Sequence, residues 1–249
     1  MDDSEYAASL ARDAGRLLVR LRASSAEQVG TDDLKDRADR ASQAFLADRL
    51  STDFPHDSVL SEEAADDSAR LGADRVWIVD PLDGTREFAE GRIDWAVHVA
   101  LWSGHRLIAG AVALPALDEV MSTGDAPRAF EPPARLRLAV SRSRASDLVT
   151  RVAGELDAEL VPMGSAGYKV AAVVRGEVDA YLHSGGQFEW DSAAPVAVAA
   201  HATLFTSRLD GSALTYNNRD PYLPDLVVCN PHIAERVLEA VHGCEMRIR

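Results

Sequence analysis

The segment that most constrains this chain is Asp80-Pro81-Leu82-Asp83-Gly84-Thr85, which continues an apolar run. Residues 75 to 80 predict a buried strand, and Pro81 is expected to end it because proline cannot donate to a sheet. Asp83 should then turn back beside Asp80, and two carboxylates that converge at a strand end form a hard-oxygen site for a cation. A helical turn that starts here would offer free N–H groups to a phosphate. A solvated turn is the alternative interpretation of this segment alone.

Two further acidic motifs flank this segment in the sequence. Glu62, in Ser61-Glu62-Glu63, follows a short strand candidate, and Asp191 precedes a run of small residues. Each has an ordinary explanation alone, a solvated pair for the first and a helix N-cap for Asp191. A carboxylate at a helix start can also hold a metal. Together with Asp80 and Asp83 they place four acids at strand ends or helix starts.

Composition limits the partners of the chain. The 249 residues suffice for one large domain or two packed ones. Acids outnumber bases 40 to 26, a net charge of −14, which disfavours nucleic acid polymers and anionic membranes. No apolar run reaches about 18 residues, so no membrane span is expected. The acidic N-terminus is unlike a signal peptide and the two cysteines suggest no disulfide framework, so we expect a cytoplasmic location.

Hydrophobic periodicity divides the chain into two parts. Before residue 130 we expect a helix that ends near residue 22, a polar loop over 23–34, a helix over 36–50, and strands at 58–61, 75–80, 95–102, 107–114 and 118–123. A hairpin turn at 103–106 is expected to join the strands at 95–102 and 107–114. After a proline-containing linker, strands at 136–140, 160–163, 178–182 and 226–229 alternate with helices at 145–156, 166–175, 191–200 and 233–241. This predicts an α/β protein with halves 1–130 and 131–249.

The acidic motifs follow one another in an order that resembles that of a known protein family. Glu62-Glu63, the segment from Asp80 to Thr85, and Trp190-Asp191-Ser192-Ala193-Ala194 resemble the inositol monophosphatase-like superfamily of magnesium-dependent, lithium-sensitive phosphatases. The resemblance covers nearly the whole chain and implies an α-β-α-β-α sandwich of the sugar-phosphatase type. Ser141-Arg142-Ser143 and Gly164-Ser165-Ala166 resemble the CysQ-type 3′-phosphoadenosine 5′-phosphate phosphatases in their actinobacterial version. This branch implies hydrolysis of the 3′-phosphate of that nucleotide to AMP, and action on its phosphosulfate, in sulfur assimilation.

The resemblance also assigns roles by motif position. It implies that two Mg²⁺ are held by Glu62, Asp80, the Leu82 carbonyl, Asp83 and Asp191. It gives catalytic roles to Glu62, Asp80, Thr85 and Asp39, of which Asp39 resembles an aspartate near a third, weaker metal position. The implied substrate-binding residues are Asp83, Gly84, Thr85, Arg86, Ser141, Arg142, Gly164, Ser165 and Asp191.

Several alternatives stay open at this point. Arg142 and Arg144 follow a strand and are candidates to clamp a second phosphate, with surface charge as the other interpretation. Residues 183–187 lack the sugar-binding glutamate of inositol-type members, which favours a nucleotide over inositol 1-phosphate or fructose 1,6-bisphosphate. A broad phosphatase and a metal-binding regulator without catalysis remain rivals, and a homodimer is one possible assembly. His98 lies in an apolar run, so we expect it to be packed or hydrogen-bonded.

Overall fold

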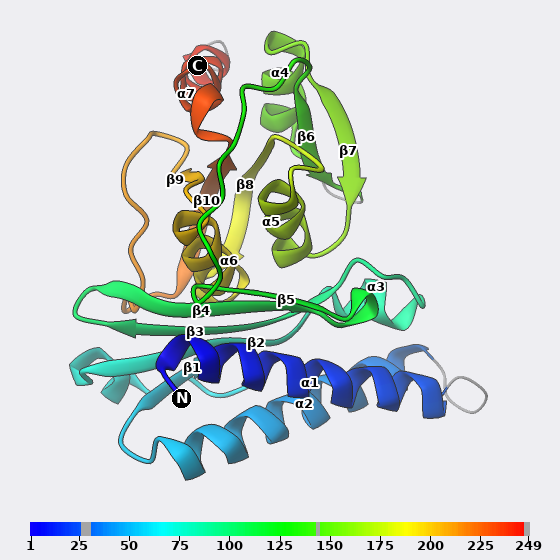
Figure 1. Cartoon of the computed structure of the whole chain (residues 1–249), viewed down its shortest axis with the longest axis vertical. Coiled ribbons are helices and arrows are strands. Elements are labelled where there is room, and N and C mark those ends of the chain that lie inside the picture. Colours follow the sequence, from blue (N-terminus) through cyan, green and yellow to red (C-terminus); the bar gives the residue numbers. More distant parts are fainter. Residues whose placement is uncertain (26–30, 143–144, 247–249) are drawn as a thin grey trace.

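The computed structural model describes residues 1–25, 31–142 and 145–246. Helices and sheets alternate in five layers from the N-terminal helices to the C-terminal helix (Figure 1). The helical layers are α1 (Asp3–Ser25) with α2 (Thr31–Asp53), then α5 (Ala166–Arg175) with α6 (Glu189–His201), and finally α4 (Asp147–Glu155) with α7 (Ala234–Met246). This arrangement confirms the expected α-β-α-β-α sandwich. The division into halves 1–130 and 131–249 stays a prediction, although the chain changes sheets between residues 122 and 137.

The first sheet has the order β1-β2-β3-β4-β5. Its strands are β1 (Ser58–Ser61), β2 (Arg75–Asp83), β3 (Ala96–Ser103), β4 (Arg106–Leu114) and β5 (Glu119–Ser122). β1 runs parallel to β2, and each later neighbour is antiparallel. One face packs on α1 and α2, and the other packs on α5 and α6. The expected hairpin is confirmed at Gly104-His105, where φ is 57° and 64°, as a two-residue type I′ turn requires.

A bulge in β2 decides where its two aspartates lie. The strand does not end at Pro81 as expected, but continues to Asp83. Asp80 pairs with His98 and Asp83 pairs with Ala96, so β2 has one extra residue between these two pairs. An extra residue moves the following side chains to the opposite face. Asp83 therefore lies on the same face as Asp80. The predicted convergence is confirmed, but its expected cause, a strand that stops at the proline, is wrong.

The second sheet has the order β7-β6-β8-β10-β9. Its strands are β6 (Arg137–Ser141), β7 (Glu159–Met163), β8 (Ala180–Phe188), β9 (Phe205–Ser207) and β10 (Tyr222–Cys229). β6 is parallel to β7 and β8, whereas β8, β10 and β9 pair antiparallel. The sequence interpretation missed β9 and made β8 and β10 too short. Gly185-Gly186 has the composition of a loop, but both residues lie within β8.

The remaining elements are short. α3 (Thr85–Ala89) follows β2 directly, and three 3-10 segments lie at Ser68–Gly72, Pro115–Leu117 and Pro231–Ile233. The polar loop expected over 23–34 was predicted to be too long, because α1 reaches Ser25 and α2 begins at Thr31. Within the described ranges, no helix combines the length and the apolar composition needed to cross a membrane.

Close packing places α6 over the aspartates of the first sheet. Gly110 of β4 faces this helix, and a Cβ at Gly110 would lie 2.7 Å from the Cβ of Ala197. A larger residue would push the helix away from the sheet. The contact therefore lets the first turn of α6, which carries Asp191, approach the end of β2.

Candidate active site

One cavity of about 610 Å³ collects most of the expected site residues. The predicted residues that line it are Glu62, Asp80, Leu82, Asp83, Gly84, Thr85, Arg86, Ser141, Gly164, Ser165 and Asp191. They come from the corner between β2 and α3, the end of β1, the end of β6, and the first turns of α5 and α6. Segments that are far apart in the sequence thus meet at one place.

Three carboxylates form the centre of the cavity. One carboxylate oxygen each from Asp80, Asp83 and Asp191 lies within 4.8 Å of the others. The Oδ2 atom of Asp80 is buried and has no hydrogen-bond partner within the described part of the chain. A buried charged oxygen without a donor is costly. Clustered carboxylate oxygens of this kind fit a hard divalent cation such as Mg²⁺.

The acids of the cavity differ in their affinity for protons. Burial, followed by the charges of Glu62 and Asp83, raises the pKa of Asp80 well above its usual value. Burial and then Asp83 raise the pKa of Asp191 to about 6. Glu62 keeps access to solvent, yet partial burial of its carboxyl and the charges of Asp191 and Asp83 raise its pKa to about 7. A bound cation would relieve this mutual repulsion.

Asp83 behaves in the opposite way. Burial alone would raise its pKa, but His98, Ser165 and the nearby Lys169 lower it to about 2. Its Oδ2 atom accepts hydrogen bonds from the Ser165 hydroxyl and from the Gly167 N–H at 2.7 Å. His98 of β3 and the first turn of α5 therefore both favour the ionised form of Asp83.

Asp191 lies inside its helix rather than at the cap. The expectation of an N-cap is wrong, because α6 already begins at Glu189. The Asp191 carboxylate accepts a hydrogen bond from the Phe188 N–H at 2.7 Å, which fixes it at the helix start.

Glu189, which we did not single out as a site residue, is buried and accepts from the N–H groups of Asn217 and Asn218 at 2.7 and 2.8 Å.

Thr85 connects the cavity to the first helical layer. Its hydroxyl lies 3.1 Å from the Leu82 carbonyl oxygen and 3.5 Å from Asp39 Oδ1. Asp39 belongs to α2 and is not one of the described residues that line the cavity. Burial, followed by the charge of Glu63, raises the pKa of Asp39 to about 7. The structure thus brings Asp39 and Thr85, which were predicted separately as catalytic residues, together at the edge of the site.

Lys169 is a site residue that the sequence interpretation missed. It lines the cavity with only 5% of its surface exposed. Its ammonium donates to the carbonyl oxygens of Ser165 and Gly164 at 2.6 and 3.2 Å and lies 5.1 Å over the Tyr181 ring. Burial lowers its pKa to about 8. The detectable signal was a single lysine among the small and apolar residues of 166–175.

The expected phosphate clamp has other partners. The Arg142 guanidinium lies 2.7 Å from Asp94 and 3.7 Å from Glu87, and Arg142 is not among the described residues that line the cavity. Arg86 lines the cavity but pairs with Glu90 at 2.8 Å. Ser143 and Arg144, named with Arg142 in the sequence interpretation, lie outside the described residues. The clamp stays a prediction.

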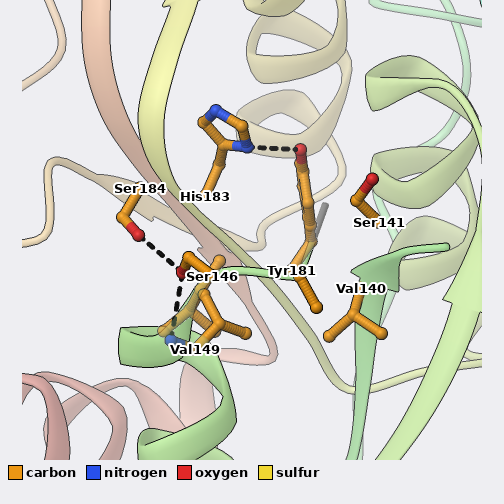
Figure 2. Close-up of a pocket in the computed structure, with 9 residues that line it drawn as sticks. Val140, Ser141, Ser146, Val149, Tyr181, His183 and Ser184 are labelled. Atoms are coloured by element: carbon orange, nitrogen blue, oxygen red, sulfur yellow. Dashed lines mark hydrogen bonds between the residues drawn. The ribbon is translucent and has the colours of Figure 1, made fainter. Parts of the chain in front are cut away.

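A small pocket of about 10 Å³ adjoins the carboxylate-lined cavity. It shares Ser141, Tyr181, His183 and Ser184 with the larger cavity. Figure 2 shows the Tyr181 hydroxyl directed at His183 and the Ser184 hydroxyl at Ser146, with distances of 3.4 and 2.7 Å. None of its described lining residues is acidic. The site therefore has a carboxylate end and an end of rings and hydroxyls.

Comparison with known proteins agrees with this site. The model of the inositol monophosphatase family matches residues 3–246. A 3′-phosphoadenosine 5′-phosphate phosphatase of Mycobacterium leprae is 48% identical and covers 97% of this chain and 94% of that protein. Its counterpart in Mycobacterium tuberculosis is 49% identical over 92% of this chain and 89% of that protein. Staphylococcal IMPase-II has the same fold, with a TM-score of 0.82, 21% identity, and coverage of 100% of this chain and 97% of that one.

These comparisons confirm the family and the fold that the acidic motifs predicted, and with them the general expectation of a phosphatase. The match extends over both sheets and all the helices that frame the cavity. The chain therefore belongs to the inositol monophosphatase family.

Proposed function

We propose that this chain is a metal-dependent phosphomonoesterase that hydrolyses the 3′-phosphate of 3′-phosphoadenosine 5′-phosphate to leave AMP. The observation that carries the proposal is the cluster of Asp80, Asp83 and Asp191 within 4.8 Å at one end of a cavity large enough for a nucleotide. The names of the mycobacterial relatives support the choice of substrate. The phosphosulfate of the same nucleotide is a second expected substrate.

The acids suit a pair of magnesium ions. Glu62, Asp80, the Leu82 carbonyl, Asp83 and Asp191 would hold two Mg²⁺, with a third and weaker position near Asp39. Bound Mg²⁺ would supply positive charge that polarises the phosphoryl oxygens and makes water easier to deprotonate. The orphaned Oδ2 atom of Asp80 supports this assignment.

The chain's own residues would orient the attacking water. The Thr85 hydroxyl faces the cavity and lies 3.5 Å from Asp39. Asp39, with its pKa near 7, can take a proton passed on by Thr85, and Glu62 is a second acceptor. Water gives up its proton to one of these acceptors and attacks the phosphorus, the bond from phosphorus to the ribose 3′-oxygen breaks, and that oxygen takes up a proton from solvent. The N–H groups of Gly84 and Thr85, at the start of α3, are suited to the phosphate.

The other end of the cavity would receive the nucleoside. His183 supplies a partly exposed ring there and Ser141 a hydroxyl, which suit a nucleobase. Tyr181 is only 2% exposed, with Lys169 over its ring, so it supports this end of the cavity from within. A cytoplasmic location and a homodimer stay predictions drawn from the sequence.

The test is phosphate release from four esters, with Mg²⁺ and after EDTA treatment. The bisphosphate nucleotide should show a higher kcat/KM than 3′-AMP, inositol 1-phosphate and fructose 1,6-bisphosphate. Activity should vanish with EDTA and return with Mg²⁺. A bisphosphate without advantage would indicate a broad or inositol-type phosphatase. A protein that binds Mg²⁺ and releases phosphate from none of the four would be the metal-binding regulator.

A further inference from the structure

His98 is a fully buried histidine directed at the carboxylate cluster. It lies in β3, paired in register with Asp80, and 0% of its surface is exposed. Its Nδ1 atom lies 3.1 Å from the Trp190 carbonyl oxygen, and its Nε2 atom lies 3.3 Å from Asp83 Oδ2. A carbonyl oxygen and a carboxylate oxygen both accept hydrogen bonds, so each ring nitrogen has an acceptor close by, although Nε2 makes no hydrogen bond within the described part of the chain. The expected packing of His98 is confirmed, but its surroundings indicate more than packing.

Gly167 makes room for this ring. A Cβ at position 167 would lie 2.0 Å from His98 Nε2 and 2.9 Å from two carbons of the ring. Glycine within a helix is less favourable than alanine. That cost has a local reason, because any side chain at this position would displace the imidazole from Asp83.

Both residues act on the same oxygen atom. Asp83 Oδ2 accepts from Gly167 N–H at 2.7 Å, from the Ser165 hydroxyl, and lies beside His98 Nε2. The two hydrogen bonds from the start of α5 hold one carboxylate oxygen, and the buried His98 ring packs against the same oxygen from β3, so the rotation of the carboxylate is restricted. Asp83 then presents one orientation to a cation instead of several.

We propose that His98 and Gly167 form a matched pair that positions Asp83 and thereby sets the affinity of the site for its divalent cation. His98 is a positioning residue in this role, since it acts through Asp83. The inference rests on the proposed function only in treating the acidic cluster as the cation site. It is therefore tested by cation binding in the absence of turnover.

The principal variant is His98→Phe, which keeps a ring of similar volume and removes both ring nitrogens. Mg²⁺ binding to the EDTA-treated full chain is measured by isothermal titration calorimetry, and thermal unfolding is followed in parallel. We expect the Kd for Mg²⁺ to rise about tenfold or more. The Mg²⁺ concentration for half-maximal phosphate release should rise by the same factor. At saturating Mg²⁺, kcat should return to within a few-fold of wild type and KM for the ester should not change.

Val112→Ala is the matched control for lost packing. Val112 lies opposite His98 on β4 and is buried in the same core. Its truncation should lower Tm and leave the Kd for Mg²⁺ unchanged.

Gly167→Ala should weaken Mg²⁺ binding as His98→Phe does, and lower Tm as well, because its methyl group displaces the ring. In the double variant His98→Ala, Gly167→Ala, Tm should recover relative to Gly167→Ala while Mg²⁺ binding stays weak.

Two results would overturn the proposal. One is a His98→Phe protein with a lowered Tm and a wild-type Kd for Mg²⁺, which would make His98 structural only. The other is a double variant with wild-type Mg²⁺ affinity, which would mean that filling the space suffices. A wild-type protein that binds Mg²⁺ but hydrolyses no ester would refute the proposed function, and the calorimetric comparison would still decide the role of His98.

Discussion

The two sheets contribute to the cavity in different ways. The first sheet supplies Asp80 and Asp83 from a bulge, and these side chains are 1% and 8% exposed. The second sheet supplies the end of β8, where Gly185 and Gly186 have φ values of 108° and 99° and residues 183–186 are partly open to solvent. The first sheet is therefore the rigid side of the cavity, and it carries groups that must keep one geometry. The end of β8 is the open side. The open side can change with little cost to the fold, so we expect it to govern substrate choice.

The largest effect should come from the rigid side. Asp80→Asn keeps the shape of the side chain and removes the charge of the central carboxylate. Loss of cation-assisted stabilisation of the transition state should lower kcat by at least about 10³-fold. Phosphate release at saturating Mg²⁺ measures it. Asp48→Asn, on the exposed side of α2, is the control and should keep full activity. Near wild-type turnover in Asp80→Asn would contradict the assignment of the site.

A smaller loss is expected at Thr85. Removing its hydroxyl leaves Asp39 without the group that lies 3.5 Å away, so the attacking water loses its orientation. Thr85→Ala should lower kcat by about 10²-fold with KM nearly constant. Steady-state kinetics over a range of ester concentrations separates the two constants, and Thr85→Ser should retain most of the activity. A raised KM with kcat intact would instead limit Thr85 to phosphate binding.

On the open side, we expect a substitution to change KM, and only for nucleotide substrates. His183 lines both pockets and its ring centroid lies 6.3 Å from that of Tyr181. A base–ring contact at a partly exposed side chain is worth about 1 kcal/mol, the lower end of the usual range, so His183→Ala should raise KM for the bisphosphate nucleotide by roughly fivefold. KM for inositol 1-phosphate, which has no base, should stay the same. An equal rise for both esters would remove the distinction drawn between the two sides.

The same contrast explains what could be predicted from sequence. Glu62, Asp80 and Asp83 lie in short motifs at strand ends and Asp191 lies in one at a helix start, so these four acids could be named without a structure. The bulge that brings Asp83 to the face of Asp80 could not be predicted, because it depends on the register with β3. The order of strands in the second sheet is also set by pairings between distant segments. β9 has only three residues, too few to show an alternating hydrophobic pattern.

Supporting residues were harder to recognise than the acids they support. His98 looks like a core residue of an apolar strand, and nothing near it in the sequence indicates that Gly167 and Asp83 lie against it. Lys169 is partnered by two backbone carbonyl groups, which have no sequence signature. The contacts of His98 join different elements, and those of Lys169 are made to backbone groups at the start of its own helix, so neither set leaves a pattern in the sequence.

The smallest effect is expected at Arg142, where sequence and structure suggest different roles. Its guanidinium is already paired with Asp94, whose other oxygen accepts from Arg92, and its side chain is 34% exposed. Asp94 is buried at 6% exposure, but it keeps its hydrogen bonds from Arg92 and from the Gly164 N–H when Arg142 is removed. Arg142→Ala should therefore lower Tm slightly and change KM for the bisphosphate nucleotide less than threefold. Arg142→Lys keeps the charge and should have a still smaller effect.

A clamp on the second phosphate would give another result. Loss of a bidentate contact to an anion should raise KM for the bisphosphate at least tenfold, with 3′-AMP unaffected. For that contact to form, Arg142 would have to leave Asp94, which also accepts a hydrogen bond from the Gly164 N–H at 2.6 Å. Asp94→Asn would then favour the clamp by weakening the competing pair, so it should lower KM in that case and leave it unchanged if Arg142 is structural. Comparing KM for the two esters in these two variants decides whether Arg142 belongs to the substrate side of the cavity or to the framework behind it.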